Sequence, residues 1–212
     1  MQKFRVGVDI GGTFTDIVFL GDGGQVLARK IASTPDDYSE AVLDGIKIGV
    51  AELGITAEMV SEVSHGFTVA TNAIIEQKGA KTALITTKGF RDILEFRRNR
   101  IPRLYDLHYE KPPPLVKRQF RLEVGERLNF KGEVLEPLNE VDVDRAVQYV
   151  LDSGVESVAI CLLHSYANPG HEQFIAQALA EKAPEVNLTV SSELLPEMKE
   201  YERTSTTVIN GY

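Results

Sequence analysis

The stretch Val6-Gly7-Val8-Asp9-Ile10-Gly11-Gly12-Thr13-Phe14-Thr15-Asp16 decides how this chain begins to fold. It runs from an apolar strand into a carboxylate, two glycines and two hydroxyl residues. Glycines let backbone N–H groups approach an anion closely, hydroxyls donate to phosphate oxygens, and a carboxylate holds Mg²⁺ through its water shell. The order therefore predicts a phosphate site with Asp9 as the catalytic, Mg²⁺-holding carboxylate. The alternative is a glycine-rich hairpin turn that binds no ligand. The residues expected to line the phosphates are Gly11, Gly12, Thr13 and Thr15, while Asp16 is either a second carboxylate near the metal or a cap of the next strand.

The flanking residues predict an antiparallel start to a sheet. Strands are expected over 3–9, 17–20 and 26–31, and the turn Gly21-Asp22-Gly23-Gly24 between the last two is a strong hairpin signal. A helix follows up to Gly54, with Asp37 and Glu40 spaced as in a capping box. The opening stretch is neither a P-loop nor a dinucleotide fingerprint. It resembles the first phosphate loop of the actin, Hsp70 and sugar-kinase ATPase superfamily.

Strands and helices alternate along most of the remaining chain. Further strands are expected over 60–64, 82–86, 157–163 and 187–191, and helices over 69–77, 89–96 and 142–154, from 169 onward and at the C-terminus. Residues 97–120 contain four prolines and predict a long loop, followed by strand-like residues 121–128 and a turn at Lys131-Gly132. The alternation predicts an α/β fold with helices on both faces of the sheet. A domain boundary near 135–140 and a sheet that continues through it both remain open.

Composition narrows the class of protein. The chain has 212 residues, 43% of them hydrophobic, and a net charge of -8, which argues against general nucleic-acid binding. Its apolar runs are too short to cross a membrane, and no signal peptide precedes the first strand. The single cysteine, Cys161, lies in an apolar run and is expected to be buried. These features predict a cytoplasmic protein without nucleic-acid or membrane partners.

Six later stretches are similar to the hydantoinase A/oxoprolinase family and follow the family's order. The resemblance spans essentially the whole chain and implies the ribonuclease-H-like half of an actin-type ATPase fold, with a mixed sheet and a long loop and hairpin insertion around 97–137. It makes residues 1–212 an N-terminal domain that lacks the C-terminal ATPase half. The stretches are His65–Glu76, Gly89–Leu94, Leu104–Leu107, Val124–Arg127, Cys161–Ser165 and Glu200–Thr206.

The resemblance also implies a reaction. Family members use ATP and Mg²⁺ to phosphorylate the oxygen of a carbonyl or cyclic amide, which makes a poor electrophile reactive, and this step depends on positioning and charge neutralisation. The implied substrate is a hydantoin, 5-oxoproline or a related carbonyl compound, opened by hydrolysis or carboxylated. A second subunit and the C-terminal half are implied partners, so the isolated chain is expected to be inactive. A small-molecule kinase of the same superfamily and a truncated, non-enzymatic assembly or regulatory module are the alternatives.

Further candidate residues follow the strand expected to end at Ser64. His65 is a candidate catalytic acid, base or oxyanion donor, because active sites of open α/β sheets collect where strands end. A hydrogen-bonded structural histidine is the alternative. Thr68, Thr71 and Asn72 are candidate substrate-binding residues at a helix N-terminus that favours an anion, and plain helix caps are the alternative.

The loop between Arg97 and Arg118 is basic in an otherwise acidic chain. Arg98, as a catalytic residue, and Arg100, as a substrate-binding residue, are candidates to clamp a carboxylate or phosphate. The patch faces either a substrate, a partner subunit or solvent. Glu200, Glu202 and Arg203 are expected to pair on the surface of the last helix.

Overall fold

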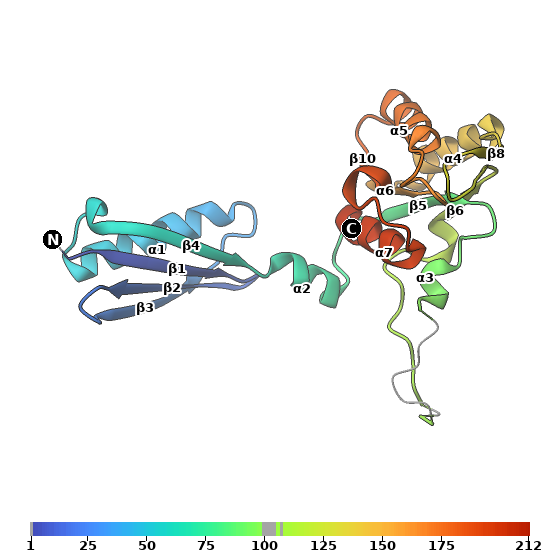
Figure 1. The fold of residues 1–212 in the computed structure, drawn as a ribbon. Helices are drawn as coiled ribbons and strands as arrows, with labels where there is room; N and C mark the ends of the chain where they lie inside the picture. Colours follow the sequence, from blue (N-terminus) through green and yellow to red (C-terminus); the bar gives the residue numbers. More distant parts are fainter. Residues whose placement is uncertain (1, 99–104, 107) are drawn as a thin grey trace. The chain divides into compact units, whose positions relative to one another are not determined.

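The structure, a computed structural model, describes residues 2–98, 105–106 and 108–212, which form two compact units divided between Gln77 and Lys78 (Figure 1). Residues 135–140, where the sequence left a domain boundary open, lie inside the second unit. There the Asn139 N–H donates to the Gly125 carbonyl at 2.8 Å, so this segment is tied into its unit. The division falls instead just after the helix that follows the fourth strand.

The first unit is a four-stranded mixed sheet, here sheet A, with the order β3-β2-β1-β4. Its first three strands are antiparallel, as the glycine turns predict, and β4 runs parallel to β1. The elements are β1 (Phe4–Ile10), β2 (Phe14–Gly21), β3 (Val26–Ala32), α1 (Tyr38–Leu53), η1 (Ala57–Met59), β4 (Val60–Phe67) and α2 (Val69–Glu76).

Helix α1 begins and ends where the sequence predicts. The Asp37 carboxylate accepts the Ser39 N–H at 2.9 Å, and Gly54 ends the helix in the left-handed region at φ 62°. Hydrogen bonds from the Ser39 hydroxyl and the Ser39 N–H lower the pKa of Asp37. The helix packs on the face of sheet A that carries the buried side chains of β1 and β2. The alternate residues of β1, which point to the other face, are exposed within the described part of the chain, so sheet A lacks there the helical cover expected on both faces.

The close approach of α1 to the sheet depends on Gly49. A Cβ at this position would lie 2.1 Å from the Phe19 ring. Gly49→Ala is therefore expected to destabilise the protein by about 1–3 kcal/mol through overpacking, although alanine is the better helix former by about 1 kcal/mol. Denaturant unfolding measures this, and the penalty should shrink in a Phe19→Leu background. A stabilising Gly49→Ala would contradict the packing.

The second unit is built on sheet B, which is entirely parallel and has the order β10-β9-β5-β6. A short hairpin, β7 with β8, follows the long loop, as expected for the insertion around 97–137. The strands are β5 (Thr82–Thr87), β6 (Arg121–Val124), β7 (Arg127–Leu128), β8 (Val134–Glu136), β9 (Ser157–Cys161) and β10 (Asn187–Val190). The helices are α3 (Ile93–Phe96), η2 (Arg118–Phe120), α4 (Glu140–Ser153), α5 (Gly170–Lys182), α6 (Ser191–Leu194) and α7 (Glu200–Gly211).

Helices cover both faces of sheet B (Figure 1). Helices α4 and α5 pack on one face through a core that includes Ile85, Val147 and Ile175, and α3 and α7 pack on the other around Leu84 and Val208. Every residue of β5 and β9 is buried, as is typical of parallel strands covered on both sides. No described helix combines the length and the apolarity needed to cross a membrane.

Candidate functional site

The glycine stretch forms a tight loop between β1 and β2. The Gly11 N–H donates to the Phe14 carbonyl at 3.0 Å, and a Cβ on Gly11 would lie 2.8 Å from that same oxygen. A larger residue at position 11 would therefore break the turn. Gly12 differs, because a Cβ there meets nothing within 4 Å and its φ lies outside the left-handed region. Nothing within the described fold requires glycine at position 12, whereas a ligand approaching the exposed backbone would require it.

The two threonines of the loop have different places. Thr13 is exposed, whereas Thr15 is fully buried. The Thr15 hydroxyl lies 2.9 Å from the Ser33 hydroxyl, which donates to the Gly11 carbonyl at 2.8 Å. Thr15 was expected to line the phosphates, but its side chain supports the loop from the core side. Strand alternation explains the difference, since Thr15 shares the inward face with Ile17 and Phe19.

Asp9 and Asp16 are brought together on the open face of sheet A. They are register partners across β1 and β2, and both point away from α1. The Lys30 ammonium lies 3.3 Å from Asp16 Oδ2. Two carboxylates directly opposite each other in a sheet repel. A cation bound between Asp9 and Asp16 would relieve that repulsion. In the described part of the chain no three potential ligands cluster for a metal, and Mg²⁺ fits two carboxylates because it keeps several waters and is completed by phosphate oxygens.

His65 does not join Asp9. Strand β4 runs on to Phe67, so His65 lies within the strand, where it pairs with Val8, while Asp9 pairs with Gly66. Side chains alternate along a strand, so His65 points to the α1 face and Asp9 to the open face. Its imidazole lines a groove beside α1. His65 was expected just after the strand, whereas the structure places it inside β4, on the face opposite Asp9.

Thr68 links the start of α2 to the loop. Its N–H and its hydroxyl both donate to the Ile10 carbonyl, at 3.1 and 3.2 Å, directly before Gly11. Thr68 is the N-cap residue, and its side chain makes no capping bond within the helix. Thr71 and Asn72 lie in the first turn of α2, and of the three candidates from this motif Thr68 is the one with a hydrogen bond beside the glycine loop among the described residues.

The candidate arginines belong to the second unit. Arg98 Nε donates to Glu202 Oε1 on α7 at 2.6 Å. The pKa of Glu202 is lowered, first by backbone hydrogen bonding and further by Arg98. Arg100 lies outside the described residues. Arg118 donates two bonds to Asp92, at 2.9 and 3.0 Å, and lowers the pKa of that carboxyl. Arg98 and Arg118 thus have acidic partners, whereas Arg97 and Lys111 donate to the carbonyls of Pro112 and Glu95.

A buried polar network that the sequence did not reveal lies at the carboxyl edge of sheet B. Glu172, fully buried on α5, accepts the Leu162 N–H at 2.8 Å, the Ser191 hydroxyl at 2.7 Å and the Ser192 N–H at 2.9 Å. Glu126 accepts from the Thr87 hydroxyl and lies 2.8 Å from His171 Nδ1. Neither carboxylate carried a local signal of burial, because Glu126 fell inside the strand expected over 121–128 and Glu172 inside an expected helix. The two carboxylates hold strand ends to helix starts.

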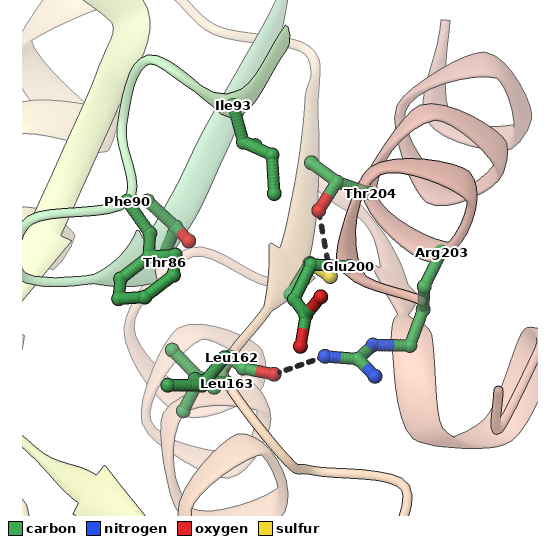
Figure 2. A pocket seen from close by; sticks show the side chains of 9 residues that line it. Thr86, Phe90, Ile93, Leu162, Leu163, Glu200, Arg203 and Thr204 are labelled. Carbon is green, nitrogen blue, oxygen red and sulfur yellow. Dashed lines mark hydrogen bonds between the residues drawn. The ribbon is translucent and has the colours of Figure 1, made fainter. Parts of the chain in front are cut away.

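Arg203 is fully buried, not on the helix surface as expected. Figure 2 shows its guanidinium directed at the Leu162 carbonyl, to which Nη2 donates at 2.7 Å, while Nη1 donates to the Glu197 carbonyl at 2.6 Å. The cavity beside it measures about 10 Å³, room for about one water molecule. Cys161, 3.2 Å from the Thr204 hydroxyl, is buried as predicted, and burial raises the pKa of its thiol. This region is packed structure, so the glycine loop of the first unit is the better candidate site.

Comparison with known proteins finds relatives along the whole chain. The chain is 40% identical over its whole length to an uncharacterized protein of Methanocaldococcus jannaschii, and 37% identical over its whole length to caprolactamase subunit alpha of Pseudomonas jessenii, covering 31% of each. The crystal structure of that ATP-dependent caprolactamase matches 98% of the chain with a TM-score of 0.83 at 36% identity, covering 31% of the solved chain. The nucleotide-free structure of an acetone carboxylase matches all of it with a TM-score of 0.85 at 27% identity, covering 32% of that chain.

The chain thus spans about a third of the length of the relatives it matches. The pattern of the hydantoinase/oxoprolinase N-terminal region matches residues 5–183, most of the chain. The motifs identified from the sequence and the fold of both units agree with that assignment. The chain belongs to the hydantoinase/oxoprolinase family and corresponds to its N-terminal region.

Proposed function

We propose that this chain is the N-terminal part of a cytoplasmic enzyme that uses ATP and Mg²⁺ to activate a cyclic amide or ketone by phosphorylating its carbonyl oxygen. The observation that carries the proposal is the exposed loop at Gly12. No atom of the described fold would clash with a side chain at this position, so the fold itself does not require glycine there. The loop lies next to the paired carboxylates of Asp9 and Asp16. Relatives described as ATP-dependent, a caprolactamase and an acetone carboxylase, support the same class of reaction.

The residues divide into roles in this scheme. Gly11 holds the turn, the backbone N–H groups of Gly12 and Thr13 and the Thr13 hydroxyl bind the phosphates, and Asp9, with Asp16 beside it, holds Mg²⁺, which neutralises phosphate charge. The substrate oxygen attacks the γ-phosphorus and ADP leaves. For an amide, water then adds to the activated carbon, and the C–N bond breaks with the amine leaving as an acyl phosphate forms. A second water hydrolyses that acyl phosphate to a carboxylate and inorganic phosphate. Thr68 and the first turn of α2 lie on the substrate side of the loop.

The substrate is a hydantoin, 5-oxoproline, a lactam or a related carbonyl compound. The rest of the polypeptide supplies the second half of the nucleotide site, and a second subunit takes part, as the subunit naming of the caprolactamase relative suggests. Arg98 and Arg100 remain proposed substrate contacts. A phosphorylated product that accumulates without ring opening would make the protein a small-molecule kinase instead.

Gly12→Val tests the phosphate loop directly. Because a Cβ at position 12 meets no protein atom, the variant should fold with an unchanged melting temperature, while its side chain fills the approach to the loop. The Kd of the whole enzyme for Mg·ATP, measured by calorimetry, should rise at least about tenfold, the equivalent of losing about 1.4 kcal/mol. Gly23→Val, in the exposed turn between β2 and β3, should leave the Kd unchanged. Unaltered ATP binding in Gly12→Val would overturn the proposed role of the loop.

A further inference from the structure

Ser33, which directly follows β3, holds the glycine loop at two of its carbonyls. Its hydroxyl donates to the Gly11 carbonyl at 2.8 Å, and its N–H donates to the Thr13 carbonyl at 3.0 Å. The Gly11 N–H is also occupied, because it donates to the Phe14 carbonyl. Among the described residues, neither the Gly12 N–H nor the Thr13 N–H has a hydrogen-bond partner. Ser33 therefore fixes the backbone around the two N–H groups that remain for a ligand.

The hydrogen bonds of Ser33 and Thr15 run in one direction. The Thr15 hydroxyl is fully buried and lies 2.9 Å from the Ser33 hydroxyl. A serine hydroxyl has one hydrogen to donate and two lone pairs that accept. Because Ser33 gives its hydrogen to the Gly11 carbonyl, it accepts the hydrogen of Thr15. A chain of two hydrogen bonds therefore leads from Thr15 through Ser33 to the Gly11 carbonyl, and each bond polarises the next.

This chain sets the direction of the Gly12 N–H. The Gly11 C=O and the Gly12 N–H belong to one planar peptide group, and in a trans peptide these two bonds point in opposite directions. No cis peptide bond occurs in the part of the chain that the structure describes. Thr15 lies on the inward face of β2, the side of α1, so the Gly11 carbonyl is held towards that side. The Gly12 N–H consequently points to the other side, on which Asp9 is exposed.

We propose that Ser33 is a positioning residue of the phosphate loop, which aims the Gly12 N–H at the phosphate on the side of Asp9, and that Thr15 acts through Ser33. The inference rests on the proposed function of the loop. Without the Ser33 hydroxyl, the peptide between Gly11 and Gly12 would be free to rotate, because glycine adopts many backbone conformations. The N–H donor would then no longer be preorganised for a phosphate oxygen. Ser33 contributes in this way without touching the nucleotide.

Calorimetry on variants of the whole enzyme tests this role. Ser33→Ala should raise the Kd for Mg·ATP about tenfold, the change expected when a hydrogen bond to a charged group is lost. Its Kd for adenosine, which has no phosphates, should not change. Ser33→Thr keeps the hydroxyl and should bind Mg·ATP as the natural protein does. Ser61→Ala is the matched control, because the Ser61 hydroxyl donates to a carbonyl at the other end of β1, that of Phe4, at 3.1 Å, and it should leave both Kd values unchanged.

Thr15→Val distinguishes an indirect role of Thr15 from a direct phosphate contact. Valine keeps the shape of the side chain and removes the hydroxyl that orients Ser33, so the Kd for Mg·ATP should rise by less than in Ser33→Ala. The double variant should bind no more weakly than Ser33→Ala alone, because the two residues act as one unit. Effects that add in the double variant would overturn the proposed chain.

Gly12→Val, measured in the same series, separates failure of this role from failure of the loop itself. Weak Mg·ATP binding in Gly12→Val together with natural binding in Ser33→Ala would overturn the role of Ser33 and leave the phosphate loop standing. Unaltered binding in Gly12→Val would overturn both. An equal loss in Ser33→Thr or Ser61→Ala, or an equal loss of adenosine binding in Ser33→Ala, would show a general loosening of the first unit and would also overturn the role of Ser33.

Discussion

Asp9→Asn is expected to lower kcat/KM of the whole enzyme for its ATP-dependent reaction by about 10³-fold, within the range seen when one group that stabilises developing charge is removed. Asp9 is exposed on the open face of sheet A, one residue from the end of β1. Asparagine keeps its shape but removes the charge that holds Mg²⁺ against the phosphates. The fold should not suffer, because the substitution also removes a negative charge directly opposite Asp16.

Steady-state kinetics and thermal unfolding together check this prediction. Asp9→Asn should also require more Mg²⁺ for half-maximal rate, which a purely structural role of Asp9 would not produce. Asp22→Asn is the matched control, since Asp22 is an exposed aspartate in the turn between β2 and β3, and its activity should equal that of the natural protein. Full function of Asp9→Asn would exclude a catalytic role and support an assembly or regulatory module.

Glu172→Gln is expected to lower the free energy of unfolding by about 3 kcal/mol. The carboxylate is fully buried and accepts hydrogen bonds from the Leu162 N–H, the Ser191 hydroxyl and the Ser192 N–H. Glutamine replaces one accepting oxygen by an NH₂ group that faces another donor, so at least one buried donor loses its partner. The end of β9, the start of α5 and the start of α6 meet at this one side chain, so its replacement should loosen all three.

Denaturant unfolding of the 212-residue chain measures the loss. Glu181→Gln, near the exposed C-terminal end of α5, is the control and should change the free energy of unfolding by less than about 0.5 kcal/mol. A small loss in Glu172→Gln would mean that water or a shifted helix satisfies the buried donors, and that the network is not a structural clamp.

Local structure and the pairing of neighbouring strands were largely predictable from the sequence, and the pairing of distant strands was not. The antiparallel first three strands, the Asp37 cap and the glycine ends of α1 and α4 follow from local signals, and each is found where it was expected. Which strands share a sheet depends on contacts between distant residues. The uniformly buried strands β5 and β9 could have extended the first sheet, but they form a second, parallel one.

The tight turn of the glycine loop was predictable from the sequence, and the places of the other candidate residues were less so. The strand was expected over 60–64, which put His65 just after its end. The strand continues to Phe67, and its register with β1 places His65 on the face opposite Asp9. The burial of Glu172 and Arg203 had no local signal, because charged residues on short helices are usually exposed. Their positions follow from tertiary packing at the carboxyl edge of sheet B.

The most direct test of the central claim is the position of the phosphates in a structure of the whole enzyme with Mg²⁺ and a non-hydrolysable ATP analogue. We predict phosphate oxygens within hydrogen-bonding distance, about 3 Å, of the backbone N–H groups of Gly12 and Thr13, with Mg²⁺ on the side of Asp9. Phosphates bound elsewhere, with this loop free of contact, would contradict the account.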